Sequence, residues 1–382
     1  MADRVKIICD NKIPFLKGVL EPFADVTYLP PSEINNNTVK DTDALLIRTR
    51  TKCTASLLDG TKVKFIGTAT IGYDHIDTKY CDAKNIKWVN APGCNSFSVM
   101  QYMASALIAL AGKKNLKLYE KTIGIVGVGN VGTKIARLAK IFGINVLLND
   151  PPRQRLERDS MFVDFDTLIS KSDIITFHVP LIRDGIDKTF HLADEKFFEK
   201  LNTQKIIINT SRGEVINTTA LKNAIKNEFV NGCILDVWEN EPSIDTELLE
   251  MVDISTPHIA GYSADGKANG TSVVVKAVSS FFNFRIDPNW YPKELPQPKS
   301  NPSLVLDCRS KSPEENLFEA ILHTYDVLDD DNTLRNSVDT FEKQRGNYPV
   351  RREFPFYSIK TSECDKLLLE KLTNLRFNLI AE

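Results

Sequence analysis

Short apolar runs alternate with longer amphipathic segments over most of the chain. The short runs have the length and β-branched content of buried strands, and in the longer ones apolar residues recur at helical spacing. This alternation predicts β-α-β units with mostly parallel sheets. The expected strands are Val5–Cys9, Ala44–Ile47, Lys64–Thr68 and Ile86–Val89 in a first series, and Thr122–Gly127, Asn145–Asn149, Ile174–His178, Lys205–Asn209, Gly232–Asp236 and Ile254–Thr256 in a second.

The pattern changes at Pro288–Pro302, a proline-rich segment that cannot sustain a helix or a central strand. We interpret it as a linker. Beyond it the sequence predicts a small α+β tail. The expected tail elements are a strand at Ser303–Asp307, a helix at Glu314–Leu328, an acidic turn at Asp329–Asp331 and a helix at Cys364–Leu372.

Composition places the chain among ordinary globular proteins of more than one domain. It has 382 residues, of which 42% are apolar and 26% charged. The 48 Lys and Arg residues nearly balance the 50 Asp and Glu residues, so we expect neither a nucleic-acid partner nor a membrane-surface partner. The apolar stretch Val99–Gly112 is shorter than the roughly 20 residues of a membrane span and predicts a buried helix. No signal-peptide pattern is visible, and we expect a cytoplasmic protein.

The cysteines are scattered singly, with no C-x-x-C pair and no histidine at ligand spacing. We therefore expect reduced thiols and no metal site. The seven positions are Cys9, Cys53, Cys81, Cys94, Cys233, Cys308 and Cys364.

A nucleotide-binding motif lies between the strand that begins at Thr122 and the following helical pattern. Its G-x-G-x-x-G consists of Gly127 for a tight turn, Gly129 for close approach to a pyrophosphate, and Gly132 for helix packing. Asp150 ends the next strand, where a carboxylate would bind the ribose 2′-hydroxyl and favour NAD over NADP. The structural alternative for this residue is a turn aspartate before a proline.

Three polar residues follow three successive strands of the second series: Arg212, Glu241 and His258. Ligands bind at the carboxyl ends of such strands. The arginine would grip a substrate carboxylate, the histidine would take a hydroxyl proton, and the glutamate would orient the histidine and stabilise its charged form. Each also has a structural reading, as a surface arginine, a loop carboxylate and a core histidine. Asp236 could hold the nicotinamide carboxamide or be a plain strand-end acid.

These motifs together resemble the D-2-hydroxyacid dehydrogenase family over about residues 1–286. Within it, the chain is most similar to the subgroup that oxidises 4-phospho-D-erythronate to 2-oxo-3-hydroxy-4-phosphobutanoate on a route to pyridoxal 5′-phosphate. The resemblance implies an NAD-dependent dehydrogenase. The segments that carry it are Gly127–Gly132 with Asp150, Asn209–Gly213, Asp236–Pro242 and Thr256–Gly261 for the family, and Gly67–Asp77, Ala91–Asn95 and His258–Lys267 for the subgroup.

The resemblance also implies an architecture: two doubly wound α/β domains and a small α+β domain. Residues 1–94 with 260–286 would form a flavodoxin-like substrate domain, and residues 95–259 a Rossmann NAD domain. Residues 287–382 would form the dimerisation domain of a homodimer, with catalysis in the cleft between the first two domains.

The resemblance further assigns roles to individual residues. Arg212, Glu241 and His258 would be catalytic. At Val179, where the subgroup often has Thr, only a backbone contact is expected. Beside the motif glycines Gly127, Gly129 and Gly132, the implied cofactor positions are Val131, Asp150, Val179, Thr210, Ser211, Asp236 and Gly261, and the implied substrate positions are Thr49, Thr70 and Tyr262.

A phosphorylated substrate needs cations, and the sequence offers two groups of them. Arg48 and Arg50 flank Thr49, and the tail carries Lys343, Arg345, Arg351 and Arg352. We expect Arg351 or Arg352, reaching over from a partner subunit, to join Arg48 or Arg50 at the phosphate. The alternative is a solvated basic loop.

Two other functions stay open at this point. One is a dehydrogenase for another 2-hydroxy acid, such as 3-phosphoglycerate or glycerate. The other is an NAD-sensing regulatory protein that binds partners without relevant turnover.

Overall fold

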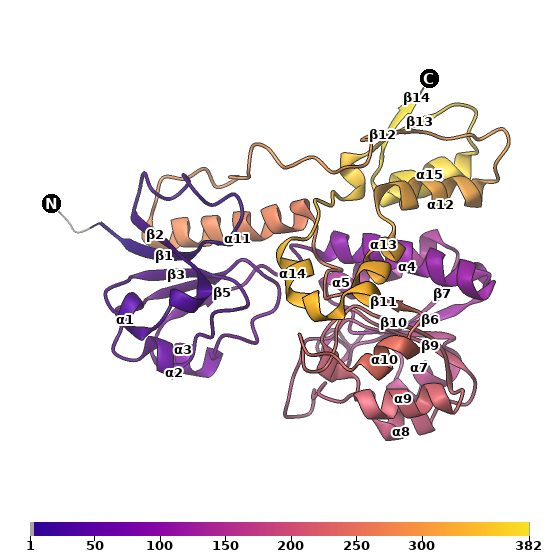
Figure 1. Ribbon diagram of the computed structural model, residues 1–382, viewed down its shortest axis with the longest axis horizontal. Helices are drawn as coiled ribbons and strands as arrows, with labels where there is room; N and C mark the ends of the chain where they lie inside the picture. The colour runs from indigo at the N-terminus through magenta and orange to yellow at the C-terminus, as the bar shows by residue number, and fades with distance from the viewer. Residues whose placement is uncertain (1–3, 382) are drawn as a thin grey trace. The chain divides into compact units, whose positions relative to one another are not determined.

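The computed structural model describes residues 4–381 (Figure 1). Contacts divide the chain into two compact units, one with residues up to Asn95 and Ser263–Pro296, the other with Ser96–Tyr262 and the chain from Gln297 onward. Both are α/β and contain parallel sheets, which confirms the fold class. Each unit is described below by itself.

The first unit contains a five-stranded parallel sheet in the order β2-β1-β3-β4-β5. This is the flavodoxin-like strand order. All strands are parallel, and the order in which successive strands are added to the sheet reverses between β1 and β3. Helix α11 (Ala264–Phe282) joins this unit through Val274, Val275 and Val278, which pack into its core. The other elements are β1 (Lys6–Asp10), β2 (Asp25–Leu29), β3 (Ala44–Ile47), β4 (Phe65–Thr68), β5 (Lys87–Val89), α1 (Asn36–Val39), α2 (Ala55–Leu58) and α3 (Thr78–Ala83).

Strand β2 is absent from the sequence prediction. It lies at the edge of the sheet and pairs only with β1, so its residues are half-buried or exposed. Its sequence, DVTYL, therefore lacks the continuous apolar run that identified the central strands. Strands β1, β3, β4 and β5 agree with the predicted series to within one residue at each end.

The second unit contains a six-stranded parallel sheet in the order β11-β10-β9-β8-β6-β7. A single bridge between Leu148 and Phe162 extends it beyond β7, where a Rossmann fold has its third strand. The sheet strands are β6 (Thr122–Val126), β7 (Asn145–Asn149), β8 (Ile174–Phe177), β9 (Lys205–Asn209), β10 (Val230–Leu235) and β11 (Ile254–Ser255). The helices are α4 (Ser96–Lys114), α5 (Asn130–Ile141), α6 (Pro151–Glu157), α7 (Phe165–Lys171), α8 (Glu195–Glu199), α9 (Thr218–Lys226) and α10 (Thr246–Met251).

The tail of the second unit forms a small parallel sheet in the order β12-β13-β14 with four helices. The predicted acidic turn at Asp329–Asp331 is wrong, and the helix before it is shorter than predicted. Asp326 accepts a hydrogen bond from the backbone N–H of Leu328 and begins a new helix, whose first turn favours acidic residues. The tail elements are β12 (Ser303–Val305), β13 (Ser358–Thr361), β14 (Asn378–Ala381), α12 (Pro313–Thr324), α13 (Val327–Asn336), α14 (Phe341–Gly346) and α15 (Lys366–Leu375).

Helix α4 is buried, as its apolar sequence predicts, and it carries buried polar residues that bind the tail. Ser98 Oγ donates to Glu353 Oε1 at 2.8 Å, and Ser105 Oγ accepts from the N–H of Val327 at 2.9 Å. These bonds and the surrounding apolar core hold the tail and the six-stranded sheet in one unit. Within residues 4–381, no helix combines the length and the apolar character that crossing a membrane requires.

The cysteine prediction is wrong for one pair. Cys308 and Cys364 form a disulfide that connects the segment after β12 to the start of α15. The other five cysteines are free, and all but Cys94 are buried. A separation of 56 residues gives no sequence signal for the pair, because only the packing of the tail brings the two side chains together.

Candidate active site

The turn between β6 and α5 has the features of a dinucleotide site. Gly127 has a φ of +87°, and a Cβ there would lie 2.7 Å from the carbonyl oxygen of His178. At Gly132 a Cβ would lie 2.0 Å from the carbonyl oxygen of Gly127. The space around Gly129 is open, and this residue starts α5 without a side-chain cap, so the first N–H groups of the helix can meet an anion. The space and backbone conformation at each glycine are therefore compatible with the motif, and their contact with a dinucleotide stays a prediction.

Asp150 lies beside this turn at the end of β7. Its Oδ2 accepts from the N–H of Val128 at 2.8 Å, and its Oδ1 caps α6 through the N–H of Arg153 at 3.1 Å. These contacts support the turn-aspartate reading and fix the glycine-rich turn, and the ribose contact stays a prediction. Glu157 pairs with the guanidinium of Arg153, three residues after Asp150, at 2.7 Å, so this cation is already partnered. This arrangement fits a free ribose hydroxyl better than a phosphate.

His178 follows β8 at the point where the sheet order reverses between β6 and β8. Its Nδ1 lies 3.2 Å from Oγ1 of Thr210, and its Nε2 lies 2.9 Å from Oγ1 of Thr176. Burial lowers the pKa of this imidazole from 6.5 to about 3, so the ring is neutral. It lies within hydrogen-bond distance of the Thr210 hydroxyl, and Val179 follows it in the chain.

The turn that carries Arg212 is held by Asn209, the buried last residue of β9. Its Oδ1 accepts from the backbone N–H and the hydroxyl of Ser211, and its Nδ2 donates to the carbonyl of Arg212 at 2.8 Å. Gly213 then packs directly on the next loop, where a Cβ would lie 2.0 Å from the carbonyl of Trp238. Sequence reasoning did not single out Asn209, although an Asn before Thr-Ser is a typical turn signal.

Glu241 and His258 form a hydrogen-bonded pair. Oε2 of the glutamate and Nδ1 of the histidine lie 2.8 Å apart, and Oε1 accepts from the N–H of Trp238. Burial by itself raises the pKa of Glu241, but the adjacent His258, these hydrogen bonds and Arg345 outweigh it and leave the pKa below its usual value. Among residues 4–381, Nε2 of His258 has no hydrogen-bond partner, so this nitrogen is available to a substrate.

Asp236, which follows β10, shapes the loop after His258. Its Oδ1 accepts from Oγ1 of Thr256 and from the N–H of Ile259, both at 2.7 Å, and its Oδ2 accepts from the N–H of Ala260 at 3.0 Å. Burial raises the pKa of this carboxyl. The plain strand-end reading of Asp236 thus has direct contacts in its support.

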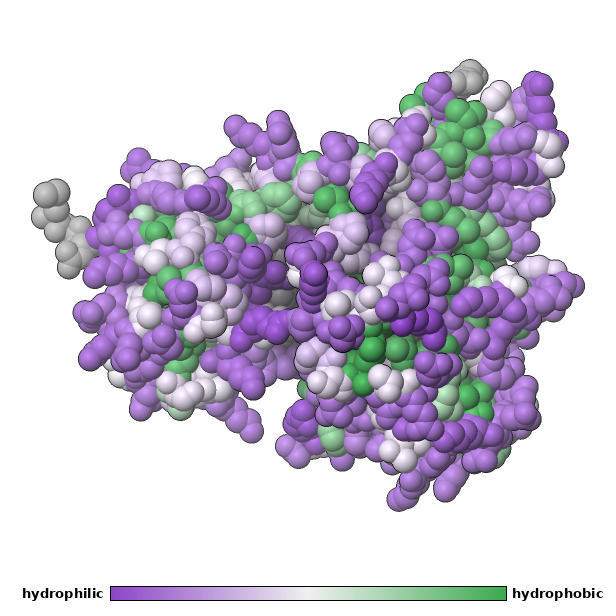
Figure 2. All heavy atoms as spheres, in the orientation of Figure 1, coloured by the Kyte–Doolittle hydropathy of each residue, from purple (hydrophilic) through white to green (hydrophobic). Residues whose placement is uncertain are grey.

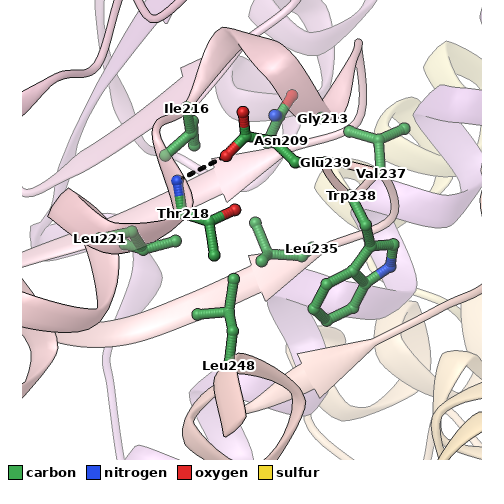
Figure 3. Close-up of a pocket in the computed structure, with 10 residues that line it drawn as sticks. All are labelled: Asn209, Gly213, Ile216, Thr218, Leu221, Leu235, Val237, Trp238, Glu239 and Leu248. Carbon is green, nitrogen blue, oxygen red and sulfur yellow. Dashed lines mark hydrogen bonds between the residues drawn. The ribbon is translucent and has the colours of Figure 1, made fainter. Parts of the chain in front are cut away.

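A second histidine–glutamate pair, His191 with Glu239, differs from the first in the ring nitrogen that meets the glutamate and in the engagement of the other nitrogen. Nε2 of His191 lies 2.7 Å from Oε1 of Glu239, and Nδ1 lies 3.3 Å from the Asn217 amide. Both ring nitrogens are therefore engaged. Glu239 also accepts from the N–H of Thr218. Both residues line a small cavity together with Leu235 and other, mostly apolar residues (Figure 3). This pair is suited to bracing the loop and not to proton transfer.

The tail brings two arginines to these loops. Arg345 Nη1 lies 4.0 Å from Oε2 of Glu241 and 3.3 Å from Glu342, and its guanidinium lies 5.7 Å from the Tyr262 ring. Arg351 is 4% exposed and binds backbone carbonyls of the loop after His258. The sequence places these arginines among other cations, which suggested a phosphate site. It does not show that Arg345 and Arg351 contact loops of their own chain.

Arg352 points elsewhere: its guanidinium stacks on the Phe356 ring at 4.2 Å. Its half-buried side chain and that of Arg351 thus have different surroundings, although the two residues are neighbours in the chain.

The remaining predicted substrate residues lie in the first unit. Arg48 and Thr49 follow β3, and Nη1 of Arg48 donates to the carbonyl of Lys12 at 3.2 Å. Thr70 follows β4, with its hydroxyl 2.7 Å from that of Thr68 and donating to the carbonyl of Gly72. Both groups lie at carboxyl ends of neighbouring strands.

Comparisons with known proteins agree with this geometry. Residues 101–260 match the family described as D-isomer specific 2-hydroxyacid dehydrogenase, NAD binding domain, and residues 295–375 match a domain of unknown function. The chain belongs to the D-isomer specific 2-hydroxyacid dehydrogenase family and is an NAD-dependent dehydrogenase.

Relatives that align over nearly their whole length share one name. The chain is 51% identical to "Erythronate-4-phosphate dehydrogenase" of Bacteroides fragilis, covering 93% of this chain and 99% of the relative. It is 38% identical to the protein of the same name in Escherichia coli, covering 98% and 99%. Among solved structures, D-lactate dehydrogenase from Aquifex aeolicus complexed with NAD and lactic acid is similar at 26% identity and a TM-score of 0.63, covering 73% of this chain and 96% of that chain.

The position of Asp150 predicts the cofactor preference. Asp150→Ala removes a charged acceptor and should weaken NAD binding by roughly 10-fold or more while changing NADP binding far less. Steady-state kinetics with both cofactors measure the ratio. Asp164→Ala is the matched control, because it removes a comparable helix cap at α7, outside the glycine-rich turn, and should leave the ratio unchanged. An unchanged ratio in Asp150→Ala would contradict the assignment.

The neutral His178 predicts a pH-dependent stability. Its folded-state pKa of about 3 lies below the ordinary 6.5, so only the unfolded chain takes up a proton as the pH falls below about 6.5. This group's contribution to the free energy of unfolding is complete above that pH and should fall by at most about 1.4 kcal/mol per pH unit below it. Urea unfolding near pH 7 and pH 5 should show a smaller acid loss in His178→Gln than in the wild type. Equal losses would show that His178 does not cause the effect.

Proposed function

We propose that the chain oxidises 4-phospho-D-erythronate at C2 with NAD, giving 2-oxo-3-hydroxy-4-phosphobutanoate for pyridoxal 5′-phosphate synthesis. The observation that carries the chemistry is the Glu241–His258 pair at 2.8 Å, with Nε2 of the histidine available to substrate. The relatives' shared name over nearly the full length supports the substrate. NAD is an intracellular cofactor, and we place the reaction in the cytoplasm.

The chain's own residues would perform the proton transfer and hold the acid. His258 Nε2 takes the proton of the C2 hydroxyl, and Glu241 stabilises the imidazolium that results. Arg212 binds the substrate carboxylate through its guanidinium. When bound, NAD supplies the hydride acceptor. The residues that would hold it are the motif glycines with Val131, Asp150, Val179, Thr210, Ser211, Asp236 and Gly261.

Substrate selection would involve hydroxyl and cationic groups outside the catalytic three. We assign substrate contacts to Thr49, Thr70 and Tyr262, and a phosphate contact to Arg48. Side-chain hydroxyls can hydrogen-bond to the hydroxyl groups and phosphate oxygens of a sugar acid, and an arginine can bind the phosphate. A second candidate substrate, 3-phosphoglycerate, shares the same carboxylate, hydroxyl and phosphate, so only a substrate panel separates the two.

The proposed base predicts a selective loss of turnover. His258→Asn should lower kcat for 4-phospho-D-erythronate by roughly 10²- to 10⁴-fold, because no group replaces the proton acceptor. NADH formation by absorbance measures turnover, and NADH fluorescence should show cofactor binding within about two-fold of the wild type.

His191→Asn is the matched control for that experiment. Both of its ring nitrogens are engaged, so turnover should persist. Undiminished turnover in His258→Asn would refute the base. Faster turnover of the wild type with 3-phosphoglycerate or glycerate would refute the substrate, and no turnover with any of the three would favour the regulatory alternative.

We also propose that the tail sheet forms a homodimer interface. Leu304 and Leu379 pack toward the core, so the alternate residues Val305 and Ile380 lie on the opposite face, where they are 62% and 44% exposed. The strand register places both beside Lys360 of the central strand. Apolar residues appear among hydrophilic ones over this part of the surface in Figure 2. An uncovered β-sheet face of this kind is typical of an interface.

The dimer prediction can be tested by placing charged residues on the exposed face of the tail sheet. Val305→Lys combined with Ile380→Lys should shift the molecular mass in light scattering from a dimer to a monomer, because lysines at an apolar interface must be desolvated. Ile186→Lys, at a residue that is 88% exposed in a different part of the chain, is the control and should stay dimeric. A dimer that survives the double substitution would place the interface elsewhere.

A further inference from the structure

Both the N–H groups and the carbonyl groups of the two residues after His258 are hydrogen-bonded to buried side chains. Ile259 and Ala260 are buried, and Asp236 accepts from both of their N–H groups. Nη2 of Arg351 donates to both of their carbonyl oxygens, at 3.1 and 2.5 Å. All four polar groups of this short segment are therefore satisfied by one carboxylate next to β10 and one guanidinium from the tail.

The guanidinium is itself held in place. It lies 4.4 Å from the Tyr325 ring and 5.8 Å from the Tyr348 ring. The hydroxyls of both tyrosines donate to the same oxygen of Asp330, at 2.7 Å each. Aromatic faces stabilise a cation, and fixed rings leave it few alternative positions. The tail thus presents Arg351 to the loop in one orientation.

This contact matters because His258 has a left-handed backbone, with a φ of +57°. A residue other than glycine keeps such a conformation only where its surroundings impose it. The bonds from Asp236 and Arg351 act on the residues directly after it. Without Arg351, two buried carbonyls would lose their donor, and the segment would be free to relax. The direction of the imidazole depends on this backbone.

We propose that Arg351 is a positioning residue for the catalytic step: it holds the loop that aims His258, and so makes the C-terminal tail part of the catalytic machinery. The proposal rests on the proposed function, in which His258 is the base. It replaces the expectation that Arg351 binds the substrate phosphate. The nitrogens that Arg351 does not use on the loop, Nε and Nη1, are buried, and a phosphate would need them exposed.

The experiment compares Arg351→Met and Arg351→Lys with the wild type. We expect Arg351→Met to lower kcat per NADH-binding site by about 10- to 100-fold, with the KM for 4-phospho-D-erythronate and the Kd for NADH within about two-fold. Arg351→Lys keeps a charge but has no planar fork, and its kcat should lie between those of Arg351→Met and the wild type. Arg376→Met, at a tail arginine that likewise stacks on an aromatic ring, Phe97 at 4.6 Å, is the matched control and should keep the wild-type kcat.

Three results would overturn the proposal. A higher KM with an unchanged kcat would make Arg351 a substrate ligand. A loss of activity that only parallels a loss of NADH-binding sites would make its role purely structural. Wild-type kcat in both variants would show that the loop does not need it.

If Arg351→Met does not fold, the kcat of Arg351→Lys alone tests the proposal. A kcat at least five-fold below that of the wild type, at unchanged NADH affinity, supports the proposal, and a wild-type kcat overturns it. Failure of the proposed function is recognised separately, because the unmodified protein would then not oxidise 4-phospho-D-erythronate. The same comparison would be made on the 2-hydroxy acid that it does oxidise.

Discussion

The parallel pairing of β9, β10 and β11 is the constraint on which the candidate active site depends. Parallel neighbours end at the same edge of a sheet, so the residues after these strands lie along one edge although they are up to 46 positions apart in the chain. Arg212, Glu241 and His258 each follow one of them. The same sheet brings β6 and β8 together at the glycine-rich turn, where the strand order reverses. The glycine-rich turn and the proposed catalytic residues thus share one edge because the strands share one direction.

Buried and half-buried polar side chains hold the loops at this common edge in place. Asn209 closes the turn of Arg212, Asp236 holds the segment after His258, and Glu239 braces the neighbouring loop. The two histidine–glutamate pairs differ in whether a ring nitrogen is left for a substrate. His191 uses both nitrogens in structural bonds, whereas His258 uses one and keeps the other available. The pair distances are nearly equal, so bond length does not separate them.

The tail is integrated with the six-stranded sheet at several points. Asp331 of α13 accepts from the backbone N–H and the hydroxyl of Ser255, and so covers the edge strand β11. Helix α4 binds the tail through buried polar groups, and Arg345 and Arg351 reach the loops of Glu241 and His258. These contacts explain why the chain from Gln297 onward forms one unit with the NAD-binding sheet.

The sequence by itself determined the parallel α/β class, nearly all the central strands, the dinucleotide turn and the three strand-end residues. Central strands are recognisable because burial on both faces requires continuous apolar runs, and the glycine spacing follows from local backbone geometry. It did not show β2, the start of α13 at Asp326 or the Cys308–Cys364 disulfide. An edge strand needs fewer apolar residues, and an acidic run is compatible with either a turn or a helix N-terminus.

Only the tertiary structure decided how the polar residues are used. In the sequence, Arg351 and Arg352 are equivalent cations in a basic cluster. In the fold, Arg351 is buried on the carbonyls of Ile259 and Ala260, and Arg352 stacks on Phe356. Likewise, the two histidine–glutamate pairs differ in which ring nitrogen meets the glutamate and in what contacts the other nitrogen. The physical reason is common to both cases: a charged or polar side chain takes its role from the groups that surround it, and distant segments of the chain supply those groups.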